Sequence, residues 1–469
     1  MADVTATELA TQGNVEAPPA PRSALLLWAV SGAAMLLVLI TPALWNGFPL
    51  IFPDTGGYLM RPLEGTLDMG RSAFYGLFLD GGIAFAFWPN VIAQAALIGW
   101  LIVLALRALG LSGRPWLALG IVVLLSVSTS LPWVAAQLMP DILFPAAVLS
   151  LHLLIFRNDT LSTFERFALA GVIAFAIASH MAAAGLAVGM VVGVWILGRI
   201  ALLSIPKPRL TFATAAVGAG ILLCPVSNWV ITGSFAFTPG GSSFIFGRLA
   251  EDGIVSKYLE EHCPDPALRL CAFKAQMADI DADDWLWDPE SPFWKLDGWQ
   301  GLGGEEEKII LATLKDYPLV HLVDAANDIF DQLTSFQTEI SMDDNGPTIG
   351  AFHDWMPQLV PQLMNARQQT GHINVAALNL LHVPVAALAM VTLLAVMIWH
   401  RRLNIPPQFV ALGVTVLLAL CINAAICAVF AHSVDRYQSR LAPLALLVVV
   451  MIGIEYWRRT RLGAAPDLP

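Results

Sequence analysis

Three short polar stretches hold the residues of this chain that could do chemistry, and each borders a long apolar run. The first stretch is FPDTGGY, residues 52–58. Proline and paired glycines beside an aspartate are typical of a turn, so we expect Asp54 to lie in a turn where a helix leaves the membrane. Ionisable groups near membrane depth are costly and are kept mainly for function. Asp54 is therefore a candidate general base, and capping of the next helix is the alternative.

The same loop, 47–83, continues with Tyr58, Arg61, Arg71 and Tyr75. Arginines among aromatic residues in an interfacial loop can bind a polar headgroup while the rings lie at headgroup level. These four residues are candidate substrate contacts. For Tyr58 and Tyr75, a plain role as interfacial anchors is the alternative.

The second stretch, 131–141, contains Gln137 and ends on Asp141, directly before an apolar run. A carboxylate at the start of a helix is favoured by the helix dipole, which alone would explain Asp141. The functional alternative is a second carboxylate opposite Asp54 that orients an acceptor or holds a divalent cation, Mg²⁺ or Mn²⁺. Gln137 is a candidate substrate contact beside it.

The third stretch is AHSVDRYQSR, residues 431–440, between the last two apolar runs. If it enters the final helix, His432, Arg436 and Arg440 lie four apart on one face, with Tyr437 beside them. Arginine offers a planar fork of donors that matches phosphate oxygens, so we expect this face to bind a phosphate. Ion pairing to Asp435 or to the acidic central region is the alternative.

The composition predicts an all-α polytopic membrane protein. Of the 469 residues, 57% are hydrophobic and 13% charged, whereas ordinary soluble domains carry about 25% charged residues. Apolar segments of about twenty residues, the length that crosses a bilayer, recur along the chain. About ten crossings are expected, near 24–46, 84–106, 116–134, 141–156, 167–179, 181–198, 210–231, 376–399, 408–430 and 441–457.

Lysines and arginines of the short loops all fall on one side if these crossings alternate. The positive-inside rule makes that side cytoplasmic, with both termini inside and the three polar stretches outside. The apolar run 167–198 is too long for one upright helix. A split at Ser179-His180 preserves the alternation and places His180, a further candidate contact, at the outer interface.

The region 232–375 is polar, acidic and rich in tryptophan. It is too long for a passive connection, so we expect a folded, mostly helical extracytoplasmic cap. Apolar residues at helical spacing within 309–329 predict amphipathic helices along the membrane, with core packing as the alternative. Cys263 and Cys271 could form a local disulfide in an oxidising compartment.

The predicted organisation is therefore a disordered cytoplasmic tail, an N-terminal transmembrane module with the catalytic first loop, the cap, a C-terminal transmembrane module and a second cytoplasmic tail. The corresponding ranges are 1–22, 23–231, 232–375, 376–460 and 461–469.

Several function classes are disfavoured. The net charge is −11 and no basic face is evident, so nucleic-acid binding gains no support. The sequence contains no G-x-x-x-x-G-K-[ST], G-x-S-x-G or H-E-x-x-H motif. An ATP-driven transporter, a serine hydrolase of the usual type and a zinc protease are thereby disfavoured.

The first loop resembles that of the GT-C superfamily, membrane glycosyltransferases that use polyprenyl-phosphate-linked sugars. The resemblance is carried by PDTGGY at 53–58 and RSAFYGLFL at 71–79, and Asp141 and Arg436-Tyr437 are similar in placement to that superfamily's second acidic loop and C-terminal phosphate-facing residues. The chain departs from the common pattern at Asp54-Thr55, where many members carry two adjacent acids, which leaves metal dependence open. The insertion with Cys263 and Cys271 lies outside the resemblance, which leaves the substrate and the acceptor open.

The resemblance implies that Asp54 is the catalytic base, that Asp141 is a second acid near the acceptor or a metal, and that Arg71, Arg436 and Arg440 contact lipid phosphate. It implies an inverting glycosyltransferase of the inner membrane that moves a sugar from a polyprenyl-phosphate donor to an extracytoplasmic glycan, lipid or protein.

Two other classes are alternatives: a transporter or flippase of a lipid-linked sugar, and a non-catalytic membrane assembly protein for envelope polysaccharide. The transporter would need broken helices at mid-membrane, and the predicted spans are mostly uninterrupted.

Overall fold

The structure is a computed structural model, and it describes residues 22–66, 70–111, 114–200, 203–237, 240–340 and 346–462. Within these ranges all regular elements are helices, and a single parallel bridge joins Leu50 to Gln137. The predicted tails, 1–22 and 461–469, fall outside the described residues except for Arg22, Arg461 and Leu462.

Six helical segments of the described chain are long and apolar enough to cross a membrane. They coincide with six of the ten predicted crossings, because a run of about twenty apolar residues can satisfy its backbone only as a helix in lipid. These segments are Ser23–Asn46 in α1, Trp88–Ala108 (α4), Thr211–Thr232 (α10), Val375–Ile398 (α20), Pro407–Phe430 (α21) and Asp435–Arg461, which covers α22 and most of α23.

The remaining predicted crossings are shorter helices. The range 116–134 was predicted as one helix, and this is wrong: the helix ends at Ser128 and a second begins at Leu131. Thr129 and Ser130 interrupt the apolar run there, with the backbone of Thr129 extended. The shorter helices are α5 (Pro115–Ser128), α6 (Leu131–Ala136), α7 (Leu143–Phe156), α8 (Thr163–Ser179) and α9 (Met181–Leu197).

The predicted split of 167–198 is confirmed. α8 ends at Ser179 and α9 begins at Met181. His180 lies between them with an extended backbone, and its Nδ1 accepts a hydrogen bond of 3.1 Å from the backbone N–H of Ala182. This bond satisfies one of the first N–H groups of α9, which have no partner within the helix.

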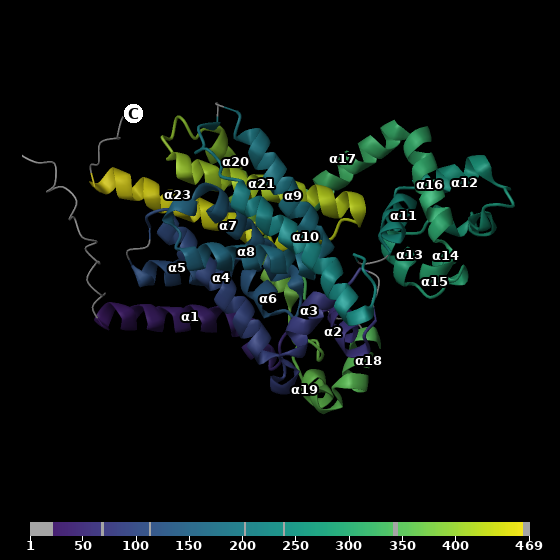
Figure 1. Cartoon of the computed structure of the whole chain (residues 1–469), viewed down its shortest axis with the longest axis horizontal. Coiled ribbons are helices and arrows are strands. Elements are labelled where there is room, and N and C mark those ends of the chain that lie inside the picture. Colours follow the sequence, from purple (N-terminus) through teal and green to yellow (C-terminus); the bar gives the residue numbers. More distant parts are fainter. Residues whose placement is uncertain are drawn as a thin grey trace, which may run out of the picture.

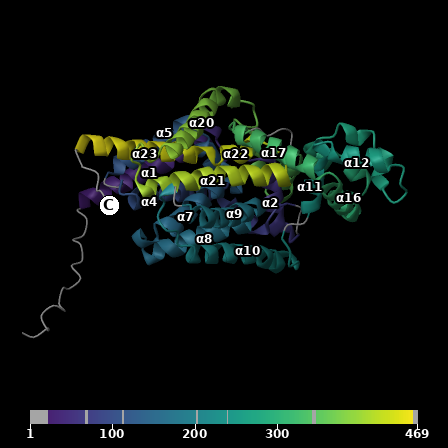
Figure 2. The ribbon, with the colours of Figure 1, turned by 90° about the horizontal axis from the view of Figure 1, so that it is seen from above.

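The long helices run side by side in one bundle (Figure 1). α1 (Arg22–Asn46) begins and α23 (Ala442–Leu462) ends at the same end of this bundle. The opposite end carries the first loop, with α2 (Pro53–Glu64) and α3 (Ala73–Asp80), and α18 (Gly346–Trp355) beside them. In the view from above, α21 lies between α23 on one side and α7 and α9 on the other (Figure 2).

A stripe of glycines sets the distance between α9 and α21. Gly185, Gly189 and Gly193 recur every four residues on one face of α9. A Cβ atom at these positions would lie 2.9, 2.9 and 2.8 Å from side-chain atoms of Ile426, Ile422 and Leu418, all in α21. Small residues let membrane helices approach closely, so this stripe fixes α21 and with it the third polar stretch that follows.

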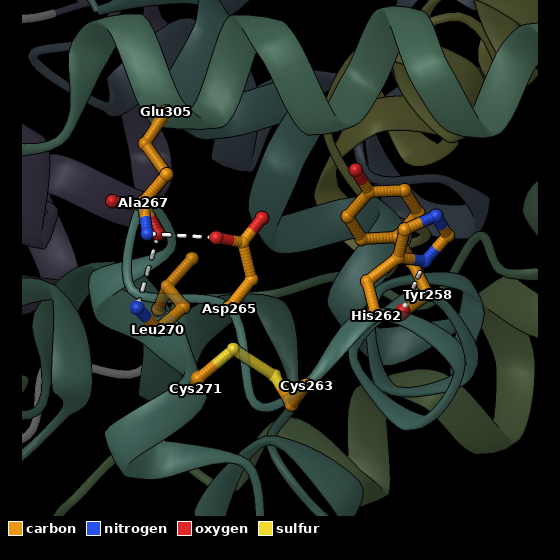
Figure 3. The surroundings of a disulfide bond; sticks show 8 residues. All are labelled: Tyr258, His262, Cys263, Asp265, Ala267, Leu270, Cys271 and Glu305. Atoms are coloured by element: carbon orange, nitrogen blue, oxygen red, sulfur yellow. Dashed lines mark hydrogen bonds between the residues drawn. A yellow bond between two sulfur atoms is a disulfide. The ribbon is translucent and has the colours of Figure 1, made fainter.

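Residues 241–316, called the side module from here on, lie beyond the end of the bundle that carries the first loop (Figure 1). The module has its own core, which includes Phe246, Trp285 and Phe293. Cys263 and Cys271 are joined by a disulfide in this module, with their Cα atoms 5.6 Å apart (Figure 3). Its helices are α11 (Gly241–Glu251), α12 (Ile254–His262), α13 (Ala282–Trp287), α14 (Pro292–Lys295), α15 (Gly298–Gly301) and α16 (Gly303–Asp316).

The amphipathic pattern at 309–329 corresponds to two helices, α16 and α17 (Pro318–Thr334), with the boundary at Tyr317. α17 packs along α21 and connects the side module to the bundle. Its apolar side chains Leu319, Leu322 and Phe330 are about two-thirds exposed or more, at 74%, 67% and 66%. Core packing therefore does not explain this part of the stripe.

Polar bonds fix the side module against the bundle. Arg248 of α11 donates to the backbone oxygen of Ala428 in α21 at 2.9 Å and forms an ion pair with Asp328 of α17. Gln332 exchanges two hydrogen bonds of 2.8 and 3.0 Å with the backbone of Val434. Gln332 belongs to α17, so this helix holds the third polar stretch through the backbone of Val434.

Candidate functional site

Asp54 lies in the first turn of α2, not in the open turn that its proline and glycines predict. Thr55 caps the N-terminus of α2: its side chain accepts a hydrogen bond of 2.9 Å from the backbone N–H of Phe52. The hydroxyl of Thr55 in turn donates to the backbone oxygen of Leu138 at 3.2 Å. Helix capping therefore does not account for the carboxylate of Asp54.

Two guanidinium groups share the Asp54 carboxylate. Arg71 donates to Oδ1, and Nη1 of Arg436, 382 positions further along the chain, donates to Oδ2 at 3.0 Å. All three side chains are largely buried, with 21%, 14% and 12% of Asp54, Arg71 and Arg436 exposed. Burial raises the pKa of Asp54, but the charges and hydrogen bonds of the two arginines outweigh it and hold that pKa well below its usual range.

Within this group of three, two guanidinium groups share one carboxylate, and Arg436 also interacts electrostatically with Glu339. Arg436 also lies over the ring of Phe52, with 4.3 Å between its Cζ and the ring centroid. The two guanidinium groups offer forked donors that suit a phosphate, which binds arginine through parallel N–H···O bonds.

A second ion pair lies deeper. Nη1 of Arg440 donates to Oδ1 of Asp141 at 2.9 Å, and both side chains are almost fully buried. Arg440 also donates to Oδ1 of Asn423 at 3.0 Å and lies 3.3 Å from the centroid of the Phe144 ring. This placement does not support the predicted role of Arg440 as a phosphate contact. Its ion-pair partner is Asp141 and not Asp435 or the acidic region.

The ring of His180 packs edge-on against the same Phe144, at 5.3 Å between centroids. His180 and Arg440 thus both contact Phe144. The hydrogen bond from Ala182 gives His180 a role at the start of α9.

His432 does not share a helical face with Arg436 and Arg440, and that prediction is wrong. α22 begins only at Asp435 and ends at Ser439, so His432 precedes the helix. The Nε2 atom of His432 lies 3.5 Å from Oδ1 of Asp283 in the side module. Asp435 accepts a hydrogen bond of 2.7 Å from the backbone N–H of Gln337. The ring centroid of Tyr437 lies 5.2 Å from the Cζ atom of Arg436 and 5.2 Å from that of Arg440.

The tyrosines of the first loop are buried, so neither is an interfacial anchor. Tyr58 and Tyr75 pack edge to face with 5.3 Å between ring centroids. The hydroxyl of Tyr75 donates to Gln94 at 2.7 Å, and Gln94 donates to the backbone oxygen of Gln137 at 2.7 Å. Gln137 reaches the backbone oxygen of Glu339 at 3.0 Å. These residues form the buried support of the site.

The first loop and the second polar stretch are joined through the backbone. Leu50 donates to the oxygen of Ala136 at 3.0 Å, and Leu138 donates to the oxygen of Leu50 at 2.8 Å. Arg61, by contrast, bonds within its own loop, to the backbone oxygen of Gly57 at 2.9 Å and to Thr66 at 2.8 Å. The structure therefore does not bring Arg61 to the Asp54 carboxylate.

Three residues of the site escaped the sequence analysis. Gln94 and Asn423 are amides inside the apolar runs of α4 and α21, and a lone polar residue in such a run is a usable signal. Glu339 carries no comparable signal. It lines a cavity of about 260 Å³ together with Thr338, Asn379 and Asp435, and burial raises the pKa of its carboxyl.

The donor set does not fit a divalent cation. Asp54 and Asp141, the two predicted ligands, are each bound to at least one guanidinium group. Elsewhere in the described ranges, no three or more His, Cys, Asp or Glu side chains gather in a way that could hold a metal. The carboxylates therefore act here as partners of arginine.

Comparison with protein-family models, with curated proteins and with solved structures finds no match to this chain. A function can therefore be inferred only from the geometry and charge of the site.

The buried pair yields a stability prediction. Asp141→Asn leaves the buried Arg440 without its countercharge, and breaking such a pair costs about 3–5 kcal/mol. The matched control, Glu290→Gln, breaks the exposed pair with Lys295 (N···O 3.3 Å) and should cost at most about 1 kcal/mol. Thermal unfolding of the purified protein in detergent checks both. Equal midpoints for Asp141→Asn and the wild type would contradict the structural role of this pair.

Proposed function

We propose that this protein is an integral membrane glycosyltransferase of the GT-C kind, which moves a sugar from a polyprenyl-phosphate donor to an extracytoplasmic acceptor. The observation that carries the proposal is the Asp54 carboxylate between Arg71 and Arg436 at one end of the helix bundle. It combines a group that can accept a proton with donors that can hold a phosphate.

The proposed topology has ten crossings, both termini in the cytoplasm, and the side module with α17 as the extracytoplasmic cap. Support comes from α1 and α23, whose terminal ends lie at the same end of the bundle (Figure 1). Arg458 in the last turns of α23 reaches the backbone oxygen of Gly110 at 3.5 Å, so the loop after α4 lies at that end too. Arginines concentrated there fit a cytoplasmic face.

In the proposed reaction, the donor phosphate binds the guanidinium groups of Arg71 and Arg436. The phosphate takes up part of the charge that lowers the pKa of Asp54, so donor binding raises that pKa toward its ordinary value. Asp54 then accepts the proton of an acceptor hydroxyl while the hydroxyl oxygen bonds to the anomeric carbon of the sugar. The bond from that carbon to the phosphate oxygen breaks, and the electron pair leaves with the polyprenyl phosphate.

The two arginines stabilise the leaving phosphate, which is the larger electrostatic contribution in a site shielded from water. Base catalysis by Asp54 contributes roughly 10²–10⁴-fold. Tyr58, Tyr75 and Gln137 do not contact the substrate in this proposal. They hold the first loop and the second polar stretch in place through ring packing and hydrogen bonds.

A flippase of lipid-linked sugars remains the second candidate. The expectation of mostly uninterrupted spans spoke against it, but the structure breaks one predicted span, 116–134, between α5 and α6. Broken helices are common at the substrate sites of transporters. A flippase would move the donor without consuming it, whereas the transferase releases polyprenyl phosphate.

The first functional prediction concerns Asp54→Asn. This variant should fold and lose transfer by at least about 100-fold, because the amide cannot take the proton. The assay uses purified protein in nanodiscs with undecaprenyl-phosphate glucose, galactose, mannose or arabinose and a membrane glycan extract, and measures the release of undecaprenyl phosphate. Asp80→Asn, an exposed carboxylate at the end of α3, is the matched control and should keep full activity. Full activity in Asp54→Asn would refute the assignment.

The activity should also depend on pH through Asp54. The pKa of Asp54 is lowered in the folded protein, so the carboxylate stays ionised at all pH values above the ordinary aspartate pKa of about 3.9. The acid limb of kcat/KM that this group causes should therefore lie below about pH 4 in the wild type. Arg71→Gln removes one of the two guanidinium groups, which should move this limb to higher pH. A limb at unchanged or lower pH in Arg71→Gln would contradict the charge coupling.

The proposed topology predicts on which side of the membrane two exposed positions lie. A cysteine introduced by Glu290→Cys in the side module should react with a membrane-impermeant maleimide in intact cells, because Glu290 is exposed on the proposed outer side. Arg402→Cys, an exposed position in the loop between α20 and α21, should react only after the membrane is opened. Both substitutions are made in a Cys421→Ser background. The reverse pattern would overturn the proposed topology.

A further inference from the structure

Four aromatic side chains form a cluster at the surface of the side module: Phe244, Trp287, Trp294 and Trp299, called the aromatic platform from here on. Trp287 and Trp294 are 46% and 41% exposed, although the module also has a buried tryptophan, Trp285, in its core. Ring centroids are 6.3 Å apart for Phe244 and Trp287, 6.2 Å for Trp287 and Trp299, and 6.5 Å for Trp294 and Trp299. The rings pack against one another, and Trp287 and Trp294 leave part of their apolar surface exposed.

The aromatic platform adjoins the Asp54 site through Arg71. The guanidinium group that binds Asp54 also lies 5.8 Å from the ring centroid of Trp287. The preceding residue, Gly70, has φ +70°, and a Cβ there would come within 3.1 Å of the Phe244 ring. The first loop is thus packed directly against the platform, so a molecule on Trp287 would lie next to Arg71, the arginine that binds Asp54.

The charge around the platform argues against a lipid surface as its ligand. The segment 279–290 contains six acidic residues and no lysine or arginine, and Trp287 lies within it. Asp283 and Glu290 are 63% and 81% exposed. Anionic bilayers attract basic segments and repel acidic ones, so insertion of Trp287 among lipid headgroups is unfavourable.

The same combination of groups suits a carbohydrate. The face of an aromatic ring is electron-rich and attracts the polarised C–H bonds on one face of a sugar. Carboxylates are acceptors only, which matches the hydroxyl groups that a sugar offers as donors.

We propose that the aromatic platform binds a neutral oligosaccharide, the acceptor of the transfer, and presents one of its hydroxyls to Asp54. The presentation step rests on the proposed function. Binding of the oligosaccharide does not, because it needs neither the donor nor catalysis.

Binding is measured on the full-length protein in nanodiscs of neutral lipid, by isothermal titration with maltohexaose, cellohexaose and α-1,6-mannohexaose, without donor. At least one of these should bind the wild type, and Trp287→Leu should weaken that binding about tenfold or more, as expected for a central aromatic contact. The matched control is Trp116→Leu, a 54% exposed tryptophan at the start of α5. It should leave binding unchanged.

The proposal is overturned if none of the three oligosaccharides binds at millimolar concentration, or if Trp287→Leu binds as tightly as the wild type. It is also overturned if Trp287→Leu instead reduces association of the detergent-solubilised protein with phosphatidylglycerol vesicles, which would make the platform a membrane contact. Oligosaccharide binding without sugar transfer would refute the proposed function alone. Transfer that depends on Asp54, with no effect of Trp287→Leu on binding or on the acceptor KM, would refute the platform alone.

Discussion

One carboxylate between two guanidinium groups is the interaction on which this site depends. Asp54, Arg71 and Arg436 come from the first loop and from the stretch before the last helix, and their side chains meet in a largely buried position. Desolvating three charges is costly, and the mutual attraction offsets this only when the geometry is held firmly. Most of the surrounding structure can be understood as the means of holding it.

Asp54 and Arg436 are each preceded by a segment of non-helical backbone. Polar side chains form hydrogen bonds with the N–H and C=O groups of these segments. Gln368 accepts from the N–H of Ile51 at 3.1 Å and donates to the oxygens of Ile51 at 2.7 Å and Ile340 at 3.1 Å. Gln332 does the same for Val434. Irregular backbone near a bilayer is tolerated only where protein groups or water complete its hydrogen bonds. The amides therefore determine where helices can end and where Asp54 and Arg436 can face each other.

The helices were largely predictable from the sequence, whereas the pairing of charges was not. Long apolar runs predict α1, α4, α10, α20 and α21 because lipid enforces helix formation in such runs. The break at Thr129-Ser130 was missed, since two small polar residues barely alter the hydropathy of the run. The glycine stripe at 185, 189 and 193 was present in the sequence as a small-residue repeat and points to close helix packing. The partner of Arg440 could not be predicted, because Asp141 and Asp435 are equivalent by residue type and only the folded geometry distinguishes them. Glu339 was missed because a carboxylate within the polar region 232–375 carries no signal of its own.

In the proposed function, Asp54 and a lipid phosphate compete for the same two arginines. The most direct measurement is the affinity of the protein in neutral nanodiscs for undecaprenyl phosphate, for the wild type, Asp54→Asn, Arg436→Gln and the double variant. Removing the carboxylate should tighten binding several-fold, removing the arginine should weaken it by a similar factor or more, and the two effects should not be additive, since both act on one ion pair. Unchanged or weaker binding in Asp54→Asn, together with unchanged binding in Arg436→Gln, would contradict the account.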